Sequence, residues 1–173
     1  KRTDKVDTNG PWSSTGNLEI EKVNTNSTAM KNVEFKISVG TDTNKSMVIV
    51  KDGKIIARAH NQKETKTDTT KHAEILAIQK ASKKLKSWRL IDCEMYVTLE
   101  PCSMCAGAMI NSRIKKVYIG AKDEKTGAVG SVLNLFNDYT FNHKVEVETG
   151  IMEKECQEIL KQFFKELRML KKK

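Results

Sequence analysis

Residues 96–108 read YVTLEPCSMCAGA, a stretch that combines a short apolar run with a proline and two cysteines. The apolar run has the residue types of a β-strand, and Pro101 is typical of the first turn of a helix. We therefore expect a strand, a turn and a helix over residues 95–111. Cys102 and Cys105 are three positions apart, so both sulfurs lie on one face of the first helical turn and can converge on one tetrahedral zinc ion.

A second motif, KHAEI, occupies residues 71–75 and opens another predicted helix, over residues 71–86. Apolar residues recur there at helical spacing, with lysines facing outward. His72 would complete a set of three protein ligands, which leaves a coordination position for water, as in catalytic zinc sites. The ligands would lie at two helix N-termini, whose positive ends lower the pKa of thiols.

Glu74 lies in the same turn as His72 and is predicted to act as a proton shuttle. Zinc lowers the pKa of a bound water, and a carboxylate within reach can take the proton of this water and return one to a leaving amine. This combination of residue types predicts hydrolytic deamination at an electron-poor ring carbon.

A structural metal site is the alternative interpretation, because Cys-x-x-Cys also occurs in redox and structural zinc motifs. Such a site would need a fourth ligand, for which the candidates are His143, Cys93 and Cys156. However, His-x-Glu followed roughly 30 residues later by Pro-Cys-x-x-Cys is more specific than either half and is typical of zinc-dependent deaminases. We therefore favour a catalytic site.

The rest of the chain predicts an α/β layered domain, because strands alternate with helices. Asp52-Gly53 separates two apolar runs and is a strong hairpin signal. The further expected elements are strands at residues 33–39, 47–50, 55–59, 117–120 and 145–147, a polar loop at 61–70, a short helix at 131–136, a long amphipathic C-terminal helix from residue 152 to residue 170, and mostly irregular chain over residues 1–31.

The composition is that of one soluble globular domain: 173 residues, of which 38% are hydrophobic and 31% are charged. No apolar run approaches the roughly 18 residues needed to span a bilayer, and no secretory signal is recognisable, so we expect a cytoplasmic protein with reduced cysteines. The formal net charge is +9, with the excess almost entirely after residue 46. This charge suits a polyanion such as nucleic acid, and equally a solvated basic surface.

The chain resembles the bacterial tRNA-specific adenosine deaminases of the cytidine deaminase-like superfamily. The resemblance covers roughly residues 47–170 and rests on ARAHN at 57–61, KHAEI at 71–75, SWRL at 87–90, the stretch 96–108, SRI at 112–114, FNH at 141–143 and FF at 163–164. It implies a three-layer α/β fold with a mixed five-stranded sheet flanked by helices, one Zn²⁺ per chain, a homodimer, and conversion of the wobble adenosine of a tRNA anticodon stem-loop to inosine.

The resemblance also implies roles for single residues. Asn61 and Asn142 would contact the flipped nucleotide, while Phe164 and Arg168 would hold its neighbours in the anticodon loop. Asn61 would suit a turn cap equally well, Arg168 a solvated chain end, and one of the two adjacent phenylalanines is expected in the core. Lys122, Asp123 and Lys125 lie in a loop whose family counterpart touches RNA.

Residues 1–46 depart from the family, because a strand pattern stands where the family has a helix. We therefore expect a deaminase domain at residues 47–173 behind an atypical polar segment. Position 71 also departs from the family, because this chain has a lysine where the family has a small or apolar residue. The alternative functions are a deaminase of free nucleobases or nucleosides, of guanine or cytosine type, and a catalytically silent zinc-binding assembly module, which would have no use for Glu74.

Overall fold

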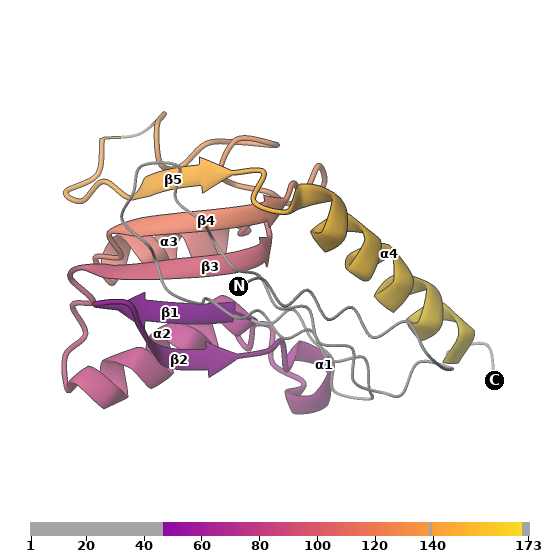
Figure 1. The fold of residues 1–173 in the computed structure, drawn as a ribbon, viewed down its shortest axis with the longest axis horizontal. Coiled ribbons are helices and arrows are strands. Elements are labelled where there is room, and N and C mark those ends of the chain that lie inside the picture. The colour runs from indigo at the N-terminus through magenta and orange to yellow at the C-terminus, as the bar shows by residue number, and fades with distance from the viewer. Residues whose placement is uncertain (1–46, 139, 171–173) are drawn as a thin grey trace, which may run out of the picture.

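The structure is a computed structural model that describes residues 47–138 and 140–170 (Figure 1). The expected strand at 33–39 and the irregular segment before it lie outside the described residues. The elements are β1 (Met47–Lys51), β2 (Lys54–Ala59), α1 (Lys63–Lys66), α2 (Ala73–Leu85), β3 (Cys93–Leu99), α3 (Ser103–Asn111), β4 (Lys116–Ala121), β5 (Glu146–Thr149) and α4 (Glu153–Leu170).

The strands form one mixed five-stranded sheet in the order β2-β1-β3-β4-β5. β1 is antiparallel to both β2 and β3, whereas β3, β4 and β5 run parallel to one another. The predicted hairpin is confirmed: Asp52 and Gly53 have φ angles of 50° and 69°, the positive values that a two-residue turn of this kind requires.

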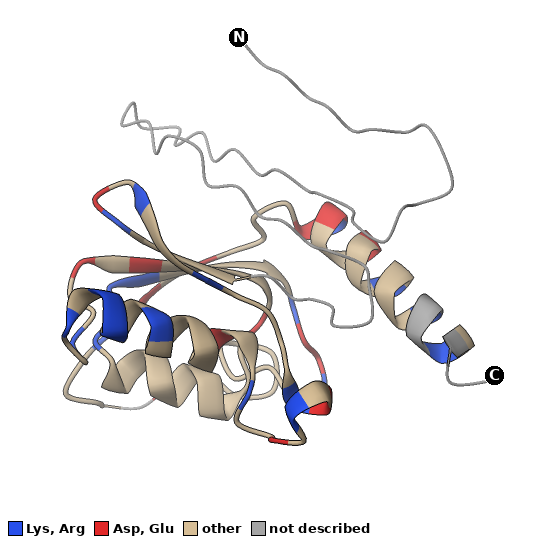
Figure 2. Ribbon diagram, turned by 90° about the horizontal axis from the view of Figure 1, so that it is seen from below, with Lys and Arg blue, Asp and Glu red and all other residues tan. Residues whose placement is uncertain are grey.

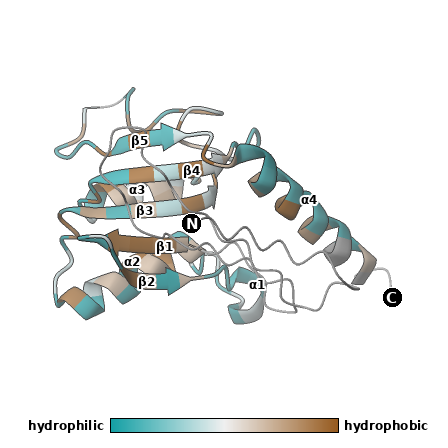
Figure 3. Cartoon of the chain, in the orientation of Figure 1, coloured by the Kyte–Doolittle hydropathy of each residue, from teal (hydrophilic) through white to brown (hydrophobic). Residues whose placement is uncertain are grey.

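Helices lie on both faces of the sheet, which confirms the expected α/β fold. α2 and α3 lie side by side on one face (Figure 1) and enclose the larger apolar core with residues such as Ala77, Met95 and Met109. α4 packs on β4 from the other face, where Cys156 and Leu160 join a smaller cluster around Tyr96 and Tyr118. In Figure 3, β1 is hydrophobic along most of its length, while α4 alternates between hydrophilic and hydrophobic residues.

The strand directions bring several chain segments to one edge of the sheet. Because β1 is antiparallel to both of its neighbours, β2 and β3 point the same way and end at the same edge. β4 ends there too, since Leu99 pairs with Ala121. The segments that follow β2 and β3 lead into α2 and α3, so both helices begin at this edge, which we call the site edge.

Two expectations about loops are wrong. Residues 131–136 form turns instead of a helix, because their backbone groups pair with the preceding loop: the Leu135 N–H donates to the Ala128 carbonyl at 3.0 Å. Phe136 thereby enters the main core. Within residues 61–70, expected as a loop, α1 forms a single helical turn.

Exposed lysines line the outer side of α2, namely Lys80, Lys83 and Lys84, and Figure 2 shows them as blue segments on that helix. Within the described parts of the chain, no helix has both the length and the apolarity needed to cross a bilayer.

Candidate active site

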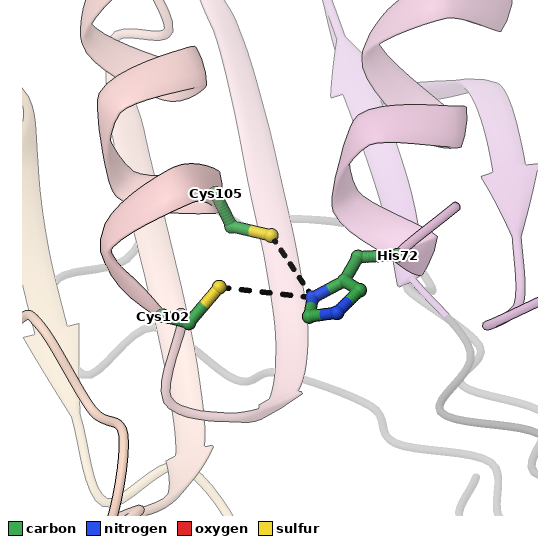
Figure 4. A group of neighbouring side chains, drawn as sticks. All are labelled: His72, Cys102 and Cys105. Atoms are coloured by element: carbon green, nitrogen blue, oxygen red, sulfur yellow. Dashed lines mark hydrogen bonds between the residues drawn. The ribbon is translucent and has the colours of Figure 1, made fainter. Parts of the chain in front are cut away.

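The two sequence motifs meet at the site edge. His72 is the N-cap residue of α2, Cys102 is the N-cap residue of α3, and Cys105 lies in the first turn of α3. His72 Nδ1 is 3.7 Å from Cys102 Sγ and 3.6 Å from Cys105 Sγ, and the three side chains converge from two helices (Figure 4). Their three ligand atoms all lie within 4.8 Å of one another.

These distances fit a tetrahedral zinc ion. Zinc binds sulfur at about 2.3 Å and histidine nitrogen at about 2.0 Å, so a nitrogen and a sulfur on the same tetrahedral ion are separated by about 3.6 Å. The two observed separations agree with this edge length. The donor set therefore fits zinc without rearrangement, and three protein ligands leave a fourth position for water or substrate.

The surroundings of the two thiols shift their pKa values in opposite directions. The pKa of Cys102 is lowered to about 5, first by a hydrogen bond from the Cys105 thiol and then by backbone N–H groups of the first turn of α3 and by His72. The pKa of Cys105 is raised, chiefly because this thiol donates to Cys102 and is buried. These shifts make Cys102 the more acidic of the two thiols, and a zinc ion would bind both cysteines as thiolates.

Glu74 lies beside the three ligands. Its side chain is only 7% exposed and sits in the first turn of α2, where the positive end of the helix favours a carboxylate. Its negative charge is one of the causes that raise the pKa of the Cys105 thiol. Glu74 is thus a buried carboxylate in the first turn of the helix that begins at His72, and it is not part of the group that can hold a metal ion.

The three candidates for a fourth ligand lie elsewhere. Cys93 begins β3 at the opposite edge of the sheet, Cys156 lies on α4 and is buried in the smaller cluster on the other face, and His143 Nε2 is 2.7 Å from the Ile114 carbonyl oxygen. Among the described residues, the group of His72 with Cys102 and Cys105 is the one that can hold a metal ion. The geometry is therefore that of an open site.

The segment before His72 is held by an ion pair. Lys71 Nζ lies 3.4 Å from Asp68 Oδ2, and Asp68 accepts hydrogen bonds from the Thr70 N–H and hydroxyl groups at 2.8 Å and 2.6 Å. The hydrogen bonds from Thr70 lower the pKa of Asp68. The unusual lysine is thus accommodated beside the site without displacing His72.

Glu100 is a residue that the sequence did not single out. It lies between β3 and the Pro101-Cys102 turn and is only 4% exposed. Its carboxylate accepts hydrogen bonds from the backbone of a distant loop, at Asp123, Val129 and Ser131. The signal that could have identified it was an acidic residue directly after a buried strand, next to the metal motif.

The two asparagines lie at different edges of the sheet. Asn61 follows β2 at the site edge, and its Oδ1 accepts a hydrogen bond from the Lys63 N–H at 2.9 Å, which confirms the turn-cap interpretation. Asn142 precedes β5 and accepts a hydrogen bond from the Arg113 guanidinium at 2.8 Å, at the edge opposite to the zinc ligands. Within one chain, the structure does not bring Asn142 to the three ligands.

A surface pocket with a volume of about 410 Å³ lies at that opposite edge. Its lining is predominantly basic and includes Arg89, Arg113, Lys115 and Lys144 together with Asp92 and Glu146.

The remaining two predicted residues lie on α4, which leads away from the sheet (Figure 1). Phe164 is 41% exposed, whereas Phe163 is half-buried and meets it edge to face at 5.2 Å. Arg168 is exposed one turn further on. α4 therefore presents an aromatic ring and a cation to solvent, on a helix that packs on the face opposite to α2 and α3.

Comparison with known proteins agrees with this geometry. A family model described as MafB19-like deaminase matches residues 20–168. The tRNA-specific adenosine deaminase of Bacillus subtilis is 51% identical over 125 residues, which covers 72% of this chain and 78% of the relative. The enzyme of the same name from Aquifex aeolicus is 50% identical over 121 residues, with 70% and 80% covered.

A solved structure supports the same relationship. It comes from work on A-to-I editing by tRNA:A34 deaminases at the wobble position of transfer RNA, and it is 44% identical to this chain with a TM-score of 0.64. The match covers 66% of this chain and 83% of the other. On the strength of the shared sequence and the shared fold, this chain belongs to the family of the bacterial tRNA-specific adenosine deaminases.

Proposed function

We propose that this chain is a zinc-dependent hydrolase that converts adenosine to inosine at the wobble position of a tRNA anticodon loop. The proposal rests on the group formed by His72, Cys102 and Cys105 together with the buried carboxylate of Glu74. It also rests on the 51% sequence identity to a tRNA-specific adenosine deaminase. The proposed deaminase domain comprises residues 47–173, behind an atypical polar sequence at residues 1–46.

The chemistry divides between the metal and Glu74. When bound by the three ligands, zinc supplies Lewis acidity, which lowers the pKa of a coordinated water. The Glu74 carboxylate accepts a proton from the attacking water and delivers one to the departing amino nitrogen of the base. The burial of Glu74 keeps bulk water away from this proton transfer, and its place in the first turn of α2 favours the charged, proton-accepting form.

Substrate contacts follow from the positions of the other predicted residues. We assign Asn61 to the target nucleotide, because it borders the site edge, and Phe164 and Arg168 to flanking nucleotides, because a ring and a cation suit bases and phosphates. Asn142 lies at the other edge beside the basic pocket. Asn142 would therefore contact the RNA from a second copy of the chain, which favours a homodimer.

The cellular setting follows from the substrate. A tRNA-modifying enzyme with free cysteines at positions 93, 102, 105 and 156 suits the reducing cytoplasm. We therefore place the protein there.

The test is inosine formation on an anticodon stem-loop, compared with ammonia release from free adenosine, cytidine and guanine under the same conditions. We expect turnover of the stem-loop and little of the free compounds, because a loop base is already unstacked and its flanking nucleotides supply binding energy for positioning. Faster release from any free compound would replace this proposal by the deaminase of free nucleobases or nucleosides. Absence of turnover with a full complement of zinc would favour the silent module.

A further inference from the structure

Glu100 joins the zinc-ligand turn to a loop that is far away in sequence. Its Oε1 accepts hydrogen bonds from the Val129 and Ser131 N–H groups at 2.9 Å and 3.0 Å. Its Oε2 accepts one from the Asp123 N–H at 3.1 Å and another from the Ser131 hydroxyl. Both oxygens of one buried carboxylate are therefore occupied by donors of the same loop, residues 122–131, which we call the anchored loop.

The anchored loop also contacts the metal-ligand turn directly. Cys102 forms an isolated antiparallel bridge with Gly127, and the Ala128 N–H donates to the Pro101 carbonyl at 2.9 Å. Asp123 closes the start of the loop by accepting hydrogen bonds from the Lys125 and Thr126 N–H groups at 3.0 Å and 3.2 Å. The loop therefore lies against the residue that supplies a zinc ligand.

Gly127 allows this close approach. A Cβ at position 127 would overlap the Glu100 carboxyl carbon and would lie 2.5 Å from the Asp123 carbonyl oxygen. The loop backbone can thus reach the carboxylate only where a side chain is missing.

A neutral side chain cannot replace this carboxylate. The groups that face Glu100 are three backbone N–H donors and one hydroxyl. An amide presents its own NH₂ donor on one side, so at least one backbone N–H would meet a donor and lose its partner. Loss of a partner by a buried donor is more costly than loss of an exposed hydrogen bond.

We propose that Glu100 is a positioning residue that holds the anchored loop against Cys102, so that Lys122 and Lys125 stand at a fixed distance from the zinc site and bind phosphates of the RNA substrate. Both lysines are exposed. Glu100 does not touch the substrate. The identity of the substrate rests on the proposed function. The anchoring of the loop by Glu100 rests on the hydrogen bonds alone.

The first test compares Glu100→Gln with a matched control, Glu94→Gln. Glu94 lies on β3, the strand that leads into Glu100, and its carboxylate also accepts a hydrogen bond, from the Tyr96 hydroxyl, but it lies at the end of the strand away from the anchored loop. Trypsin cleavage after Lys122 and Lys125, followed by mass spectrometry, measures loop release without any activity assay. We expect cleavage to be at least about tenfold faster in Glu100→Gln only, with zinc retained. Equal cleavage in both variants would overturn the anchoring.

Steady-state kinetics on the anticodon stem-loop test whether the anchored loop contributes to RNA binding. We expect Glu100→Gln to raise KM by about tenfold with a smaller effect on kcat, because phosphate contacts act on binding more than on the chemical step. Glu100→Asp, which keeps the charge, should restore part of the loss. A fall in kcat with unchanged KM would overturn the positioning role. If Glu100→Gln is cleaved faster but the wild-type protein forms no inosine, the proposed function is wrong, and so is the role of the anchored loop in RNA binding. The anchoring of the loop by Glu100 would still stand.

Gly127→Ala should also release the anchored loop, without any change to Glu100. It leaves Glu100 chemically intact but pushes the loop backbone away, so it should reproduce both the cleavage pattern and the rise in KM. If the two residues act through one contact, the double variant should be no worse than the more severe single variant. Additive effects in the double variant would overturn the proposal. Ser131→Ala removes only the hydroxyl donor and should give a smaller change, which remains measurable if Glu100→Gln fails to fold.

Discussion

The packing of α4 on the sheet can be tested at Gly120 in β4. This glycine lies directly under Cys156 of α4. A Cβ at position 120 would overlap the sulfur of Cys156, and it would lie 2.9 Å from the Thr98 carbonyl oxygen and 3.0 Å from Cys156 Cβ. Gly120→Ala therefore adds one methyl group at a point where neither neighbour has room for it.

The cost follows from what surrounds the new methyl group. Cys156 is 1% exposed, and Thr98 O belongs to the backbone of a central strand, so neither can move aside cheaply. Overpacking of a core by one methyl group usually lowers the free energy of unfolding by about 1–3 kcal/mol. Because one of the neighbours here is a backbone atom, we expect a loss in the upper part of this range, about 2–3 kcal/mol. For a domain of this size that corresponds to a fall in Tm of roughly 4–12 °C.

Thermal unfolding followed by circular dichroism, with zinc present, measures this cost. Gly107→Ala is the matched control, because a Cβ there meets nothing within 4 Å and alanine is favoured over glycine inside a helix by about 1 kcal/mol. Adding Cys156→Ala to Gly120→Ala should recover part of the stability, since the sulfur is removed while Thr98 O remains. A Tm for Gly120→Ala within about 1 °C of the wild type would refute the packing of α4 described above.

Three further predictions concern the site and the substrate. Cys102→Ala should lose zinc, measured as metal per chain by elemental analysis, whereas a requirement for Cys93 or Cys156 instead would identify a structural site. Glu74→Ala should keep zinc and fold but lose about 100-fold to 10,000-fold in turnover of the stem-loop, and an active variant would mean that another group moves the proton. RNA affinity should fall with added salt by a log–log slope of about 0.7 per phosphate contact, and deletion of residues 171–173 should reduce that slope if they touch RNA.

The zinc-site geometry could be predicted because its determinants are local. The spacing of Cys102 and Cys105 places two sulfurs on one helical turn, and Asp52-Gly53 predicts its hairpin from two residues alone. The C-terminal helix was likewise predicted from its apolar stripe, and α4 spans Glu153–Leu170. Only the meeting of His72 with the two cysteines depends on tertiary structure, and there the specificity of the combined motif supplied the missing information.

The features that could not be predicted depend on distant partners. Glu100 bonds residues that are 23 to 31 positions away, so no local pattern reveals them. Residues 131–136 were expected as a short helix, but the hydrogen bond from the Leu135 N–H to the Ala128 carbonyl draws them into turns. Asn142 was assigned to the nucleotide by resemblance, and residue type alone cannot tell that it lies at the far edge of the sheet.

The topology also places the zinc site and the proposed RNA-binding residues of α4 on opposite faces of the sheet. The zinc ligands and Glu74 belong to α2 and α3, whose inner sides form the larger core on one face of the sheet. Phe164 and Arg168 belong to α4, whose contact with the sheet runs through Cys156 and β4 on the other face. Disturbing Gly120 should therefore weaken RNA binding through α4 while leaving the zinc content unchanged. Replacing Cys102 should remove the metal while α4 stays packed, because the two cores share no side chain among the residues that the structure describes.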